Sequence, residues 1–250
     1  MEFSRRYGPW AIIAGASEGV GAEAARQLGE RGVNVVLVSR RRELLDEVAA
    51  TVASETRVLP LDLSRPDAAE VLARETADLD IGLYIYNAGA VPPASFLGDP
   101  LDKWRGVVAR NCGTVLDSVY HYAPLMAQRG SGGIVLVSSN AAWSGAASQA
   151  IYGATKAFNL VLAEGLWAEF RPLGIDVLSM VLGATDTPAF RDVLKGRIVP
   201  MATSEEVARD MLDNLANGPT FPPGPAQFGT IPRREVVETR SAAIAAALLD

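Results

Sequence analysis

The chain has 250 residues, of which 49% are apolar and 21% charged, a composition typical of a globular protein that buries a core. Its 23 basic and 29 acidic side chains give a net charge of −6, which argues against a general binder of nucleic acid or of an anionic membrane. Cys112 is the only cysteine and His121 the only histidine, which excludes an internal disulfide and a cysteine- or histidine-based metal site. No apolar run approaches the ~20 residues that span a bilayer, and the N-terminal residues lack a signal-peptide core. We therefore expect a cytoplasmic, reduced protein without a metal.

Short β-branched runs alternate with longer segments of helical periodicity from Trp10 to about Val181. The runs are mostly apolar, as in strands that are covered on both faces, and the alternation predicts a parallel sheet with right-handed crossovers. The predicted strands are Trp10–Ala14, Val33–Ser39, Arg57–Leu61, Ile81–Tyr86, Gly133–Ser138 and Ile175–Val181. The predicted helices between them are Gly21–Arg31, Arg41–Ser54, Leu101–Arg129 and Ile151–Arg171. No linker divides the pattern, so we expect one doubly wound, three-layer α/β/α domain over residues 1–250.

The pattern loosens after Val181, where Gly183–Pro200 and Gly218–Gly229 hold six of the fifteen prolines. Ser204–Asn217 between them has helical spacing, preceded by Thr203 as a predicted N-cap. Ligands of open α/β sheets bind beyond the carboxyl ends of the strands. We therefore interpret residues 184–217 as an irregular substrate lid; the alternative is a plain surface connection.

A glycine-rich loop, Gly15-Ala16-Ser17-Glu18-Gly19-Val20-Gly21, follows the first predicted strand and runs directly into a helix. Glycines allow the backbone to approach a pyrophosphate, and the helix N-terminus offers unpaired N–H groups and the positive end of the helix dipole. The position of the loop after a first strand makes a dinucleotide site the favoured interpretation.

The spacing GxxxGxG resembles that of the short-chain dehydrogenase/reductase family, whose usual form is TGxxxGxG. Other family motifs follow in the same order up to about residue 190. These are Asp62 with Leu63 after the third strand, Asn87-Ala88-Gly89 after the fourth, Asn111 in the long helix, Ser139, the YxxxK pair Tyr152 and Lys156, and the PGxxxT-like stretch with Gly183, Thr185 and Thr187.

The resemblance implies a Rossmann-like fold and an oxidoreductase that interconverts a ketone and a secondary alcohol. It assigns catalysis to Asn111, Ser139, Tyr152 and Lys156. By the same resemblance the cofactor is bound by the loop residues Gly15, Ser17, Glu18, Gly19, Val20 and Gly21, by Ser39, Arg40 and Arg41, by Asp62, Leu63, Asn87, Ala88 and Gly89, and by Tyr152, Lys156, Gly183, Thr185 and Thr187. Three positions depart from the family pattern, namely Ala14, Tyr86 and Leu182, and each flanks a cofactor contact without being a reacting group.

The YxxxK spacing also has a physical interpretation. A tyrosine hydroxyl titrates near 10, and a lysine at i+4 lies on the same helix face, so we expect Lys156 to stabilise the phenolate of Tyr152 and lower its pKa. Ser139 is expected to donate a hydrogen bond to the substrate carbonyl. By the resemblance, Asn111 holds a water that links Lys156 to a proton relay. We expect the carboxylate of Glu18 to face solvent.

The end of the second strand indicates which nicotinamide cofactor is used. Enzymes that use NAD place an acidic residue there, which binds the ribose 2′-hydroxyl and repels a 2′-phosphate. Here Ser39 is followed by Arg40 and Arg41, whose guanidinium groups suit a phosphate. We therefore predict NADP(H). The alternatives are an NAD-dependent alcohol dehydrogenase of the same family, a non-catalytic dinucleotide-binding regulator, and a sugar-nucleotide epimerase or dehydratase, for which the C-terminal part is short.

We expect a neutral, apolar carbonyl substrate, such as a hydroxysteroid-like ketone or a 3-oxoacyl compound. The segments that would border it, Ala90–Phe96, Asn140–Gln149 and Ala184–Met201, are rich in apolar side chains. The basic residues of the lid, Arg191, Lys195 and Arg197, are expected to face solvent. The long helices Leu101–Arg129 and Ile151–Arg171 resemble those through which relatives associate, which predicts a homodimer or homotetramer.

Overall fold

Seven parallel strands form the centre of the computed structural model, which describes residues 2–89 and 92–222. Their order is β3-β2-β1-β4-β5-β6-β9. The first three strands are added outward from β1 toward one edge, and β4 to β6 are then added from β1 toward the other edge. Ile12 of β1 therefore lies beside Val36 of β2 on one side and Tyr84 of β4 on the other. The strands are β1 Trp10–Ala14, β2 Asn34–Ser39, β3 Thr56–Pro60, β4 Ile81–Tyr86, β5 Gly132–Ser139, β6 Ile175–Leu182 and β9 Thr220–Phe221.

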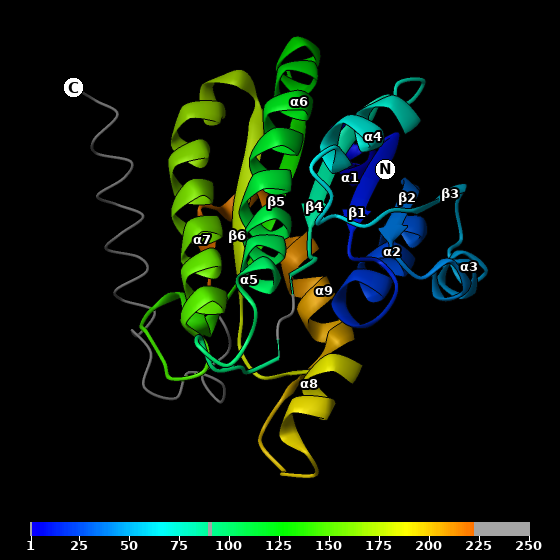
Figure 1. The fold of residues 1–250 in the computed structure, drawn as a ribbon. Coiled ribbons are helices and arrows are strands. Elements are labelled where there is room, and N and C mark those ends of the chain that lie inside the picture. Colours follow the sequence, from blue (N-terminus) through cyan, green and yellow to red (C-terminus); the bar gives the residue numbers. More distant parts are fainter. Residues whose placement is uncertain (1, 90–91, 223–250) are drawn as a thin grey trace.

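Helices cover both faces of the sheet, which gives three layers (Figure 1). One face is covered by α1, α2, α3 and α9, and the other by α4, α6 and α7, as the two clusters of buried residues show. The helices are α1 Glu2–Tyr7, α2 Gly19–Glu30, α3 Arg42–Ala49, α4 Ala68–Glu75, α5 Leu101–Val108, α6 Thr114–Arg129, α7 Ala150–Phe170, α8 Pro188–Leu194 and α9 Ser204–Asp213.

Side chains that alternate along each strand divide the core between these two faces. Ile13 of β1 packs with Leu28 of α2 on one side, whereas Ile12 packs with Tyr84 and with Val119 of α6 on the other. All five residues of β1 and all six of β4 are buried, because both strands lie in the middle of a sheet that is covered twice.

The predicted fold class, a doubly wound Rossmann-like parallel sheet, is confirmed. The six predicted strands are all present, and β1 and β4 have the predicted bounds; β2 begins one residue later, and β3 is shifted by one residue. Sequence analysis did not predict α1, α4 or the short edge strand β9. The prediction of a single domain over 1–250 extends past residue 222, and its last part lies outside the described residues.

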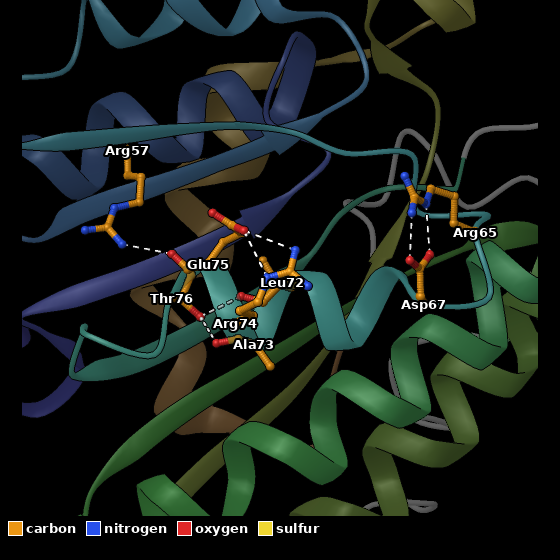
Figure 2. A network of polar contacts seen from close by, with 8 residues as sticks. All are labelled: Arg57, Arg65, Asp67, Leu72, Ala73, Arg74, Glu75 and Thr76. Atoms are coloured by element: carbon orange, nitrogen blue, oxygen red, sulfur yellow. Dashed lines mark hydrogen bonds and ion pairs between the residues drawn. The ribbon is translucent and has the colours of Figure 1, made fainter.

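The unpredicted helix α4 is anchored at its C-terminal end by polar contacts to neighbouring elements (Figure 2). The hydroxyl of Thr76 donates to the carbonyl of Leu72 and accepts a 2.8 Å hydrogen bond from the hydroxyl of Tyr122 on α6. Arg57 of β3 donates to the carbonyl of Glu75. These contacts hold α4 against β3 and α6, so tertiary packing stabilises a helix of only eight residues.

The predicted helix Leu101–Arg129 is not continuous. Five residues, Ala109–Gly113, form a π-helical turn, η1, between α5 and α6. An inserted residue of this kind changes which side chains face the core on either side of it, and π turns often occur at functional sites. The turn carries Asn111, whose side chain is fully buried. The predicted helix Arg41–Ser54 is also shorter than expected, because it ends at Ala49.

The segment that we predicted as an irregular lid contains regular structure. Helix α8 lies between two short strands, β7 Thr185–Asp186 and β8 Ala202–Thr203, which pair in parallel. The predicted cap of the next helix is confirmed, because Thr203 and Glu206 form a reciprocal capping box. That helix, α9, ends at Asp213, and the remainder of the predicted segment is a 3₁₀ turn, Leu215–Asn217.

Candidate functional site

The glycine-rich loop and the loop after β4 meet at the carboxyl end of the sheet. The amide of Asn87 donates to the carbonyl of Gly15 at 2.9 Å, and the backbone N–H groups of Asn87 and Ala88 both donate to the carbonyl of Ala14. Gly15 has φ +90°, and a Cβ there would come within 2.7 Å of the backbone nitrogen of Ala88. Only glycine therefore permits this approach, which leaves a cleft beside the N-terminus of α2.

Three predicted cofactor residues lie at the end of β2, on one wall of this cleft. Arg40 and Arg41 are exposed, and the guanidinium of Arg41 donates to the hydroxyl of Ser17 at 3.1 Å. The same guanidinium lies 3.0 Å from the carboxylate of Glu18. The Glu18 side chain is 33% exposed, so its carboxylate faces solvent in part while it pairs with Arg41.

Asp62 and Leu63 follow β3 and line the same cleft, which has a volume of about 170 Å³. Burial favours the neutral acid of Asp62, but hydrogen bonds from the backbone and hydroxyl of Ser64, aided by the charges of Arg40 and Arg110, outweigh it and lower the pKa. Asp62 is therefore a carboxylate at neutral pH. The residues that line the cleft are Gly15, Ser17, Ser39, Arg40, Arg41, Leu61, Asp62, Leu63, Ala88, Gly89 and Arg110.

Asn111 and Lys156 meet at Gly89, although they come from different helices. A Cβ at Gly89 would lie 3.1 Å from both the Oδ1 of Asn111 and the Nζ of Lys156, so any larger residue would disturb both groups. The amide of Asn111 donates to the carbonyl of Gly89 at 3.2 Å and to the hydroxyl of Thr155 at 3.0 Å. Lys156 is buried, and its ammonium donates to the carbonyl of Val137 at 2.9 Å.

Tyr152 and Ser139 lie next to this pair. Burial raises the pKa of Tyr152, and a hydrogen bond with Ser139 only partly offsets the effect. The predicted lowering of the Tyr152 pKa by Lys156 is therefore wrong for this arrangement, since the Lys156 ammonium is bonded to Val137 and lies 5.9 Å from the centre of the tyrosine ring. Burial, assisted by the charge of Arg110, lowers the pKa of Lys156 to about 8. At neutral pH the site thus presents a phenol that holds its proton beside a cationic lysine.

Thr187, the residue that precedes α8, contacts the glycine loop. A Cβ at Gly19 would come within 2.9 Å of the methyl group of Thr187, and the hydroxyl of Thr187 accepts the backbone N–H of Phe190 as the cap of α8. Thr185 is buried and donates to the carbonyl of Gly183. The structure therefore brings this motif to the same cleft. Arg191, Lys195 and Arg197 are exposed, as predicted.

A hollow beside Tyr152 is lined mostly by apolar residues. The indole N–H of Trp104 on α5 donates to the carbonyl of Phe96, and the two rings stack with centroids 6.3 Å apart. Of the predicted wall segment Ala90–Phe96, residues 90 and 91 lie outside the described residues. The hollow is lined by Pro92, Ala94, Phe96, Trp104, Ser148, Gln149, Ala150, Ile151 and Tyr152.

Two residues of this region, Thr155 and Arg110, are not among the predicted site residues. Thr155 accepts the Asn111 amide, and Arg110 extends from η1 into the cleft, where it donates to the Oδ1 of Asn111 at 3.1 Å. A sequence signal existed for Arg110 alone, because it directly precedes Asn111 in a segment of otherwise apolar and small residues.

Comparison with known proteins gives one consistent result. The family model of the short chain dehydrogenases matches residues 9–197. A 7beta-hydroxysteroid dehydrogenase from Clostridium sardiniense is 32% identical over 231 residues, which cover 88% of this chain and 87% of that protein. A solved structure from work on the stereoselectivity of 7beta-hydroxysteroid dehydrogenase has a TM-score of 0.84 at 29% identity, with both chains fully covered. A short-chain dehydrogenase from Sphingobium yanoikuyae in complex with NADPH has a TM-score of 0.82 at 27% identity, with 96% of each chain covered.

The chain belongs to the short-chain dehydrogenase family. It is an oxidoreductase that interconverts carbonyl and alcohol groups, and the prediction of an enzyme rather than a regulator is confirmed. Across the described segments 2–89 and 92–222, no helix combines the length and apolar character that a membrane crossing requires. In those same segments no group of three or more His, Cys, Asp or Glu residues is placed to hold a metal ion.

Proposed function

We propose that the protein is an NADP(H)-dependent carbonyl reductase and secondary-alcohol dehydrogenase, with Tyr152 as the general acid and base. The observation that carries this proposal is the convergence of Asn111, Ser139, Tyr152 and Lys156 on one end of a cleft whose other end is lined by a glycine loop and arginines. Both halves of the reaction, the cofactor and the proton transfer, then have residues of suitable chemistry within one site.

The cleft residues fit a dinucleotide. Gly15 and Gly21 have no room for a side chain, because a Cβ at Gly21 would come within 2.1 Å of the carbonyl of Gly15. The backbone of the loop is therefore open to a pyrophosphate, and the N–H groups of Gly19 and Val20 begin helix α2. At the far end of the cleft, Asp62 is a carboxylate suited to accept a hydrogen bond from the exocyclic amine of adenine.

The preference for NADP(H) rests on the residues after β2. Ser39 provides no carboxylate that would repel a 2′-phosphate, and Arg40 and Arg41 offer two exposed guanidinium groups beside it. The Glu18 carboxylate lies 3.0 Å from the Arg41 guanidinium, which a bound 2′-phosphate would draw away from it. The relative from Sphingobium yanoikuyae, which was solved with NADPH, supports the same assignment.

The catalytic residues provide the proton and stabilise the developing charge. When bound, the nicotinamide supplies the hydride that reduces the carbonyl carbon. Ser139 donates a hydrogen bond to the carbonyl oxygen as negative charge grows there, and Tyr152 transfers its phenolic proton to that oxygen. The raised pKa of Tyr152 suits this direction, because the phenol is protonated at neutral pH. The buried cation of Lys156, which bonds to the Val137 carbonyl, binds the nicotinamide ribose, and Asn111 holds a water that returns a proton to the site.

The substrate is a neutral ketone with a bulky apolar body, or the corresponding alcohol. Phe96 and Trp104 give the hollow beside Tyr152 an aromatic wall, and Phe96 is also partly exposed. The basic lid residues are exposed, and Arg191 is paired with Asp186 at 2.7 Å, which leaves no cation directed at the hollow from that residue. The relatives named 7beta-hydroxysteroid dehydrogenase support a steroid-like shape.

The protein assembles as a homodimer or homotetramer through α5, α6 and α7, which lie together on one side of the molecule (Figure 1). Large apolar side chains remain exposed on all three helices, an arrangement that favours burial against a symmetric copy. They are Leu101, Val108, Leu116, Tyr120, Leu125, Phe158 and Val161. A cytoplasmic location, where NADPH is available, suits a chain whose single cysteine is free.

The test is an absorbance assay of NADPH oxidation with a panel of bulky neutral ketones, matched keto acids and acyl thioesters. We expect the neutral ketones to give the highest kcat/KM. A clear advantage for the anionic compounds would contradict the apolar pocket, and equal use of NADH would contradict the cofactor assignment.

A further inference from the structure

Arg110 occupies a central place between the two ends of the cleft. It belongs to the π-helical turn η1, and its side chain lines the cleft with Gly15, Ala88 and Asp62. The hydroxyl of Tyr86, at the end of β4, donates to the backbone carbonyl of Arg110. The turn that carries Arg110 is therefore attached to the sheet by a specific contact.

The guanidinium of Arg110 determines how the amide of Asn111 is oriented. Its Nε donates to the Oδ1 of Asn111 at 3.1 Å, while the Nδ2 of Asn111 donates to the carbonyl of Gly89 and to the hydroxyl of Thr155. A guanidinium has no acceptor, so only the oxygen of the amide can face it. Within residues 2–89 and 92–222, the Nε of Arg110 is the donor that bonds to this oxygen, so its removal would leave the amide free to rotate.

Arg110 also acts electrostatically on Lys156. The charged and titratable groups that act on the buried ammonium are Arg110 and Cys112 from η1 and Tyr152 on its own helix, whereas β5 contributes the carbonyl of Val137. Of these, Arg110 is the cation, and its repulsion adds to the effect of burial in lowering the Lys156 pKa. The effect of Cys112 has the opposite sign.

We propose that Arg110 is a positioning residue for the reaction. It fixes the orientation of the Asn111 amide and places a positive charge near Lys156 on the cofactor side of the site. This inference rests on the proposed roles of Asn111 and Lys156. It gives Arg110 an effect on both ends of the site, since the same side chain lines the cofactor cleft and donates to the relay amide.

The test compares Arg110→Met with Arg110→Lys and with Arg105→Met as a matched control. Arg105 is an exposed arginine of α5 that pairs only with Asp102 among the described residues, so its loss is expected to change nothing. In Arg110→Met we expect kcat to fall by about ten- to a hundredfold while KM for the ketone stays within about twofold, because misplacement of a relay group affects turnover more than substrate binding. Arg110→Lys keeps the charge but not the directed Nε–H, so it should recover only part of kcat.

A second readout separates this role from a merely structural one. Loss of a neighbouring cation raises the pKa of Lys156, so the ammonium persists to higher pH in Arg110→Met. The affinity for NADPH, measured by fluorescence titration, falls as Lys156 loses its proton. The pH midpoint of this fall should be about half a pH unit or more higher in Arg110→Met than in the parent. Arg110→Lys should keep the position of the parent. A structural role would lower stability without moving this midpoint.

Tyr86→Phe provides an independent variant if Arg110→Met does not fold. It removes only the hydroxyl that holds the Arg110 carbonyl, and we expect a smaller fall in kcat in the same direction. The inference is overturned if Arg110→Met matches Arg105→Met in kcat and in the pH midpoint of NADPH binding. A parent that turns over no carbonyl compound would instead contradict the proposed function, and the binding midpoint, which needs no turnover, would still decide the role of Arg110.

Discussion

Replacing Arg41 by leucine is expected to lower kcat/KM for NADPH by about 5- to 30-fold and to leave kcat/KM for NADH unchanged. A hydrogen bond to a charged group contributes about 1.5–3 kcal/mol. The side chain of Arg41 is 51% exposed, so solvent screens its pairing with a 2′-phosphate, and we reduce the figure to about 1–2 kcal/mol. A change of about 1–2 kcal/mol corresponds to the loss of about 5- to 30-fold in kcat/KM for NADPH.

Glu18→Gln is the companion variant, because the Glu18 carboxylate lies 3.0 Å from Arg41 and competes with a phosphate for it. An exposed ion pair contributes about 0–1 kcal/mol, so neutralising Glu18 should raise kcat/KM for NADPH by up to about fivefold. The assay is initial-rate NADPH and NADH oxidation at a saturating ketone concentration. Equal losses with both cofactors in Arg41→Leu, or a fall with NADPH in Glu18→Gln, would refute the assignment of Arg41 to the 2′-phosphate.

Three further predictions concern catalysis, stability and assembly. Tyr152→Phe should reduce kcat by at least about a hundredfold and leave NADPH binding intact, because only the proton donor is removed; activity within about tenfold of the parent would show that another group is the acid. Burial raises the pKa of the Tyr122 hydroxyl from its usual 10.0 to about 12, despite its hydrogen bond with Thr76. The folded state thus binds the phenolic proton more tightly than the unfolded chain. The resulting contribution to the free energy of unfolding, about 3 kcal/mol, is complete below about pH 10 and is lost between about pH 10 and 12. Urea unfolding should show a smaller loss over that window in Tyr122→Phe, and an equal loss would contradict it. Val161→Asp should reduce the mass measured by light scattering to that of one chain, since Val161 is 58% exposed on α7, and a parent that is already monomeric at micromolar concentration would exclude the proposed interface.

Much of the central sheet could be predicted because its strands are buried on both faces. All five residues of Trp10–Ala14 are buried, so the run of apolar residues shows in the sequence both that a strand is present and where it begins and ends. Helix α4 could not be predicted, because its eight residues are held by contacts with β3 and α6 rather than by their own periodicity. The π turn at Ala109–Gly113 also leaves no periodic signal, since one extra residue per turn looks like ordinary helix in sequence.

In the candidate site, too, the sequence predicts which residues take part better than it predicts how they are arranged. Motif spacing predicted that Asn111, Tyr152 and Lys156 would meet, but not how their charges would be arranged. The i+4 spacing indicates that Lys156 shares a helix face with Tyr152, yet the ammonium bonds to the Val137 carbonyl, and burial dominates the tyrosine pKa. Likewise, nothing in the sequence shows that the Glu18 carboxylate would turn toward Arg41, because these residues are separated by a whole helix and strand.

The contact between Thr187 and Gly19 has a consequence for the kinetic order of the reaction. Thr187, the cap residue of α8, rests on the glycine loop, so a dinucleotide bound at that loop as proposed would fix the start of α8 before a ketone binds beside it. We expect a compulsory sequence in which NADPH enters first and the oxidised cofactor leaves last. Product inhibition should then be competitive between the two nicotinamide forms and noncompetitive for the alcohol against NADPH.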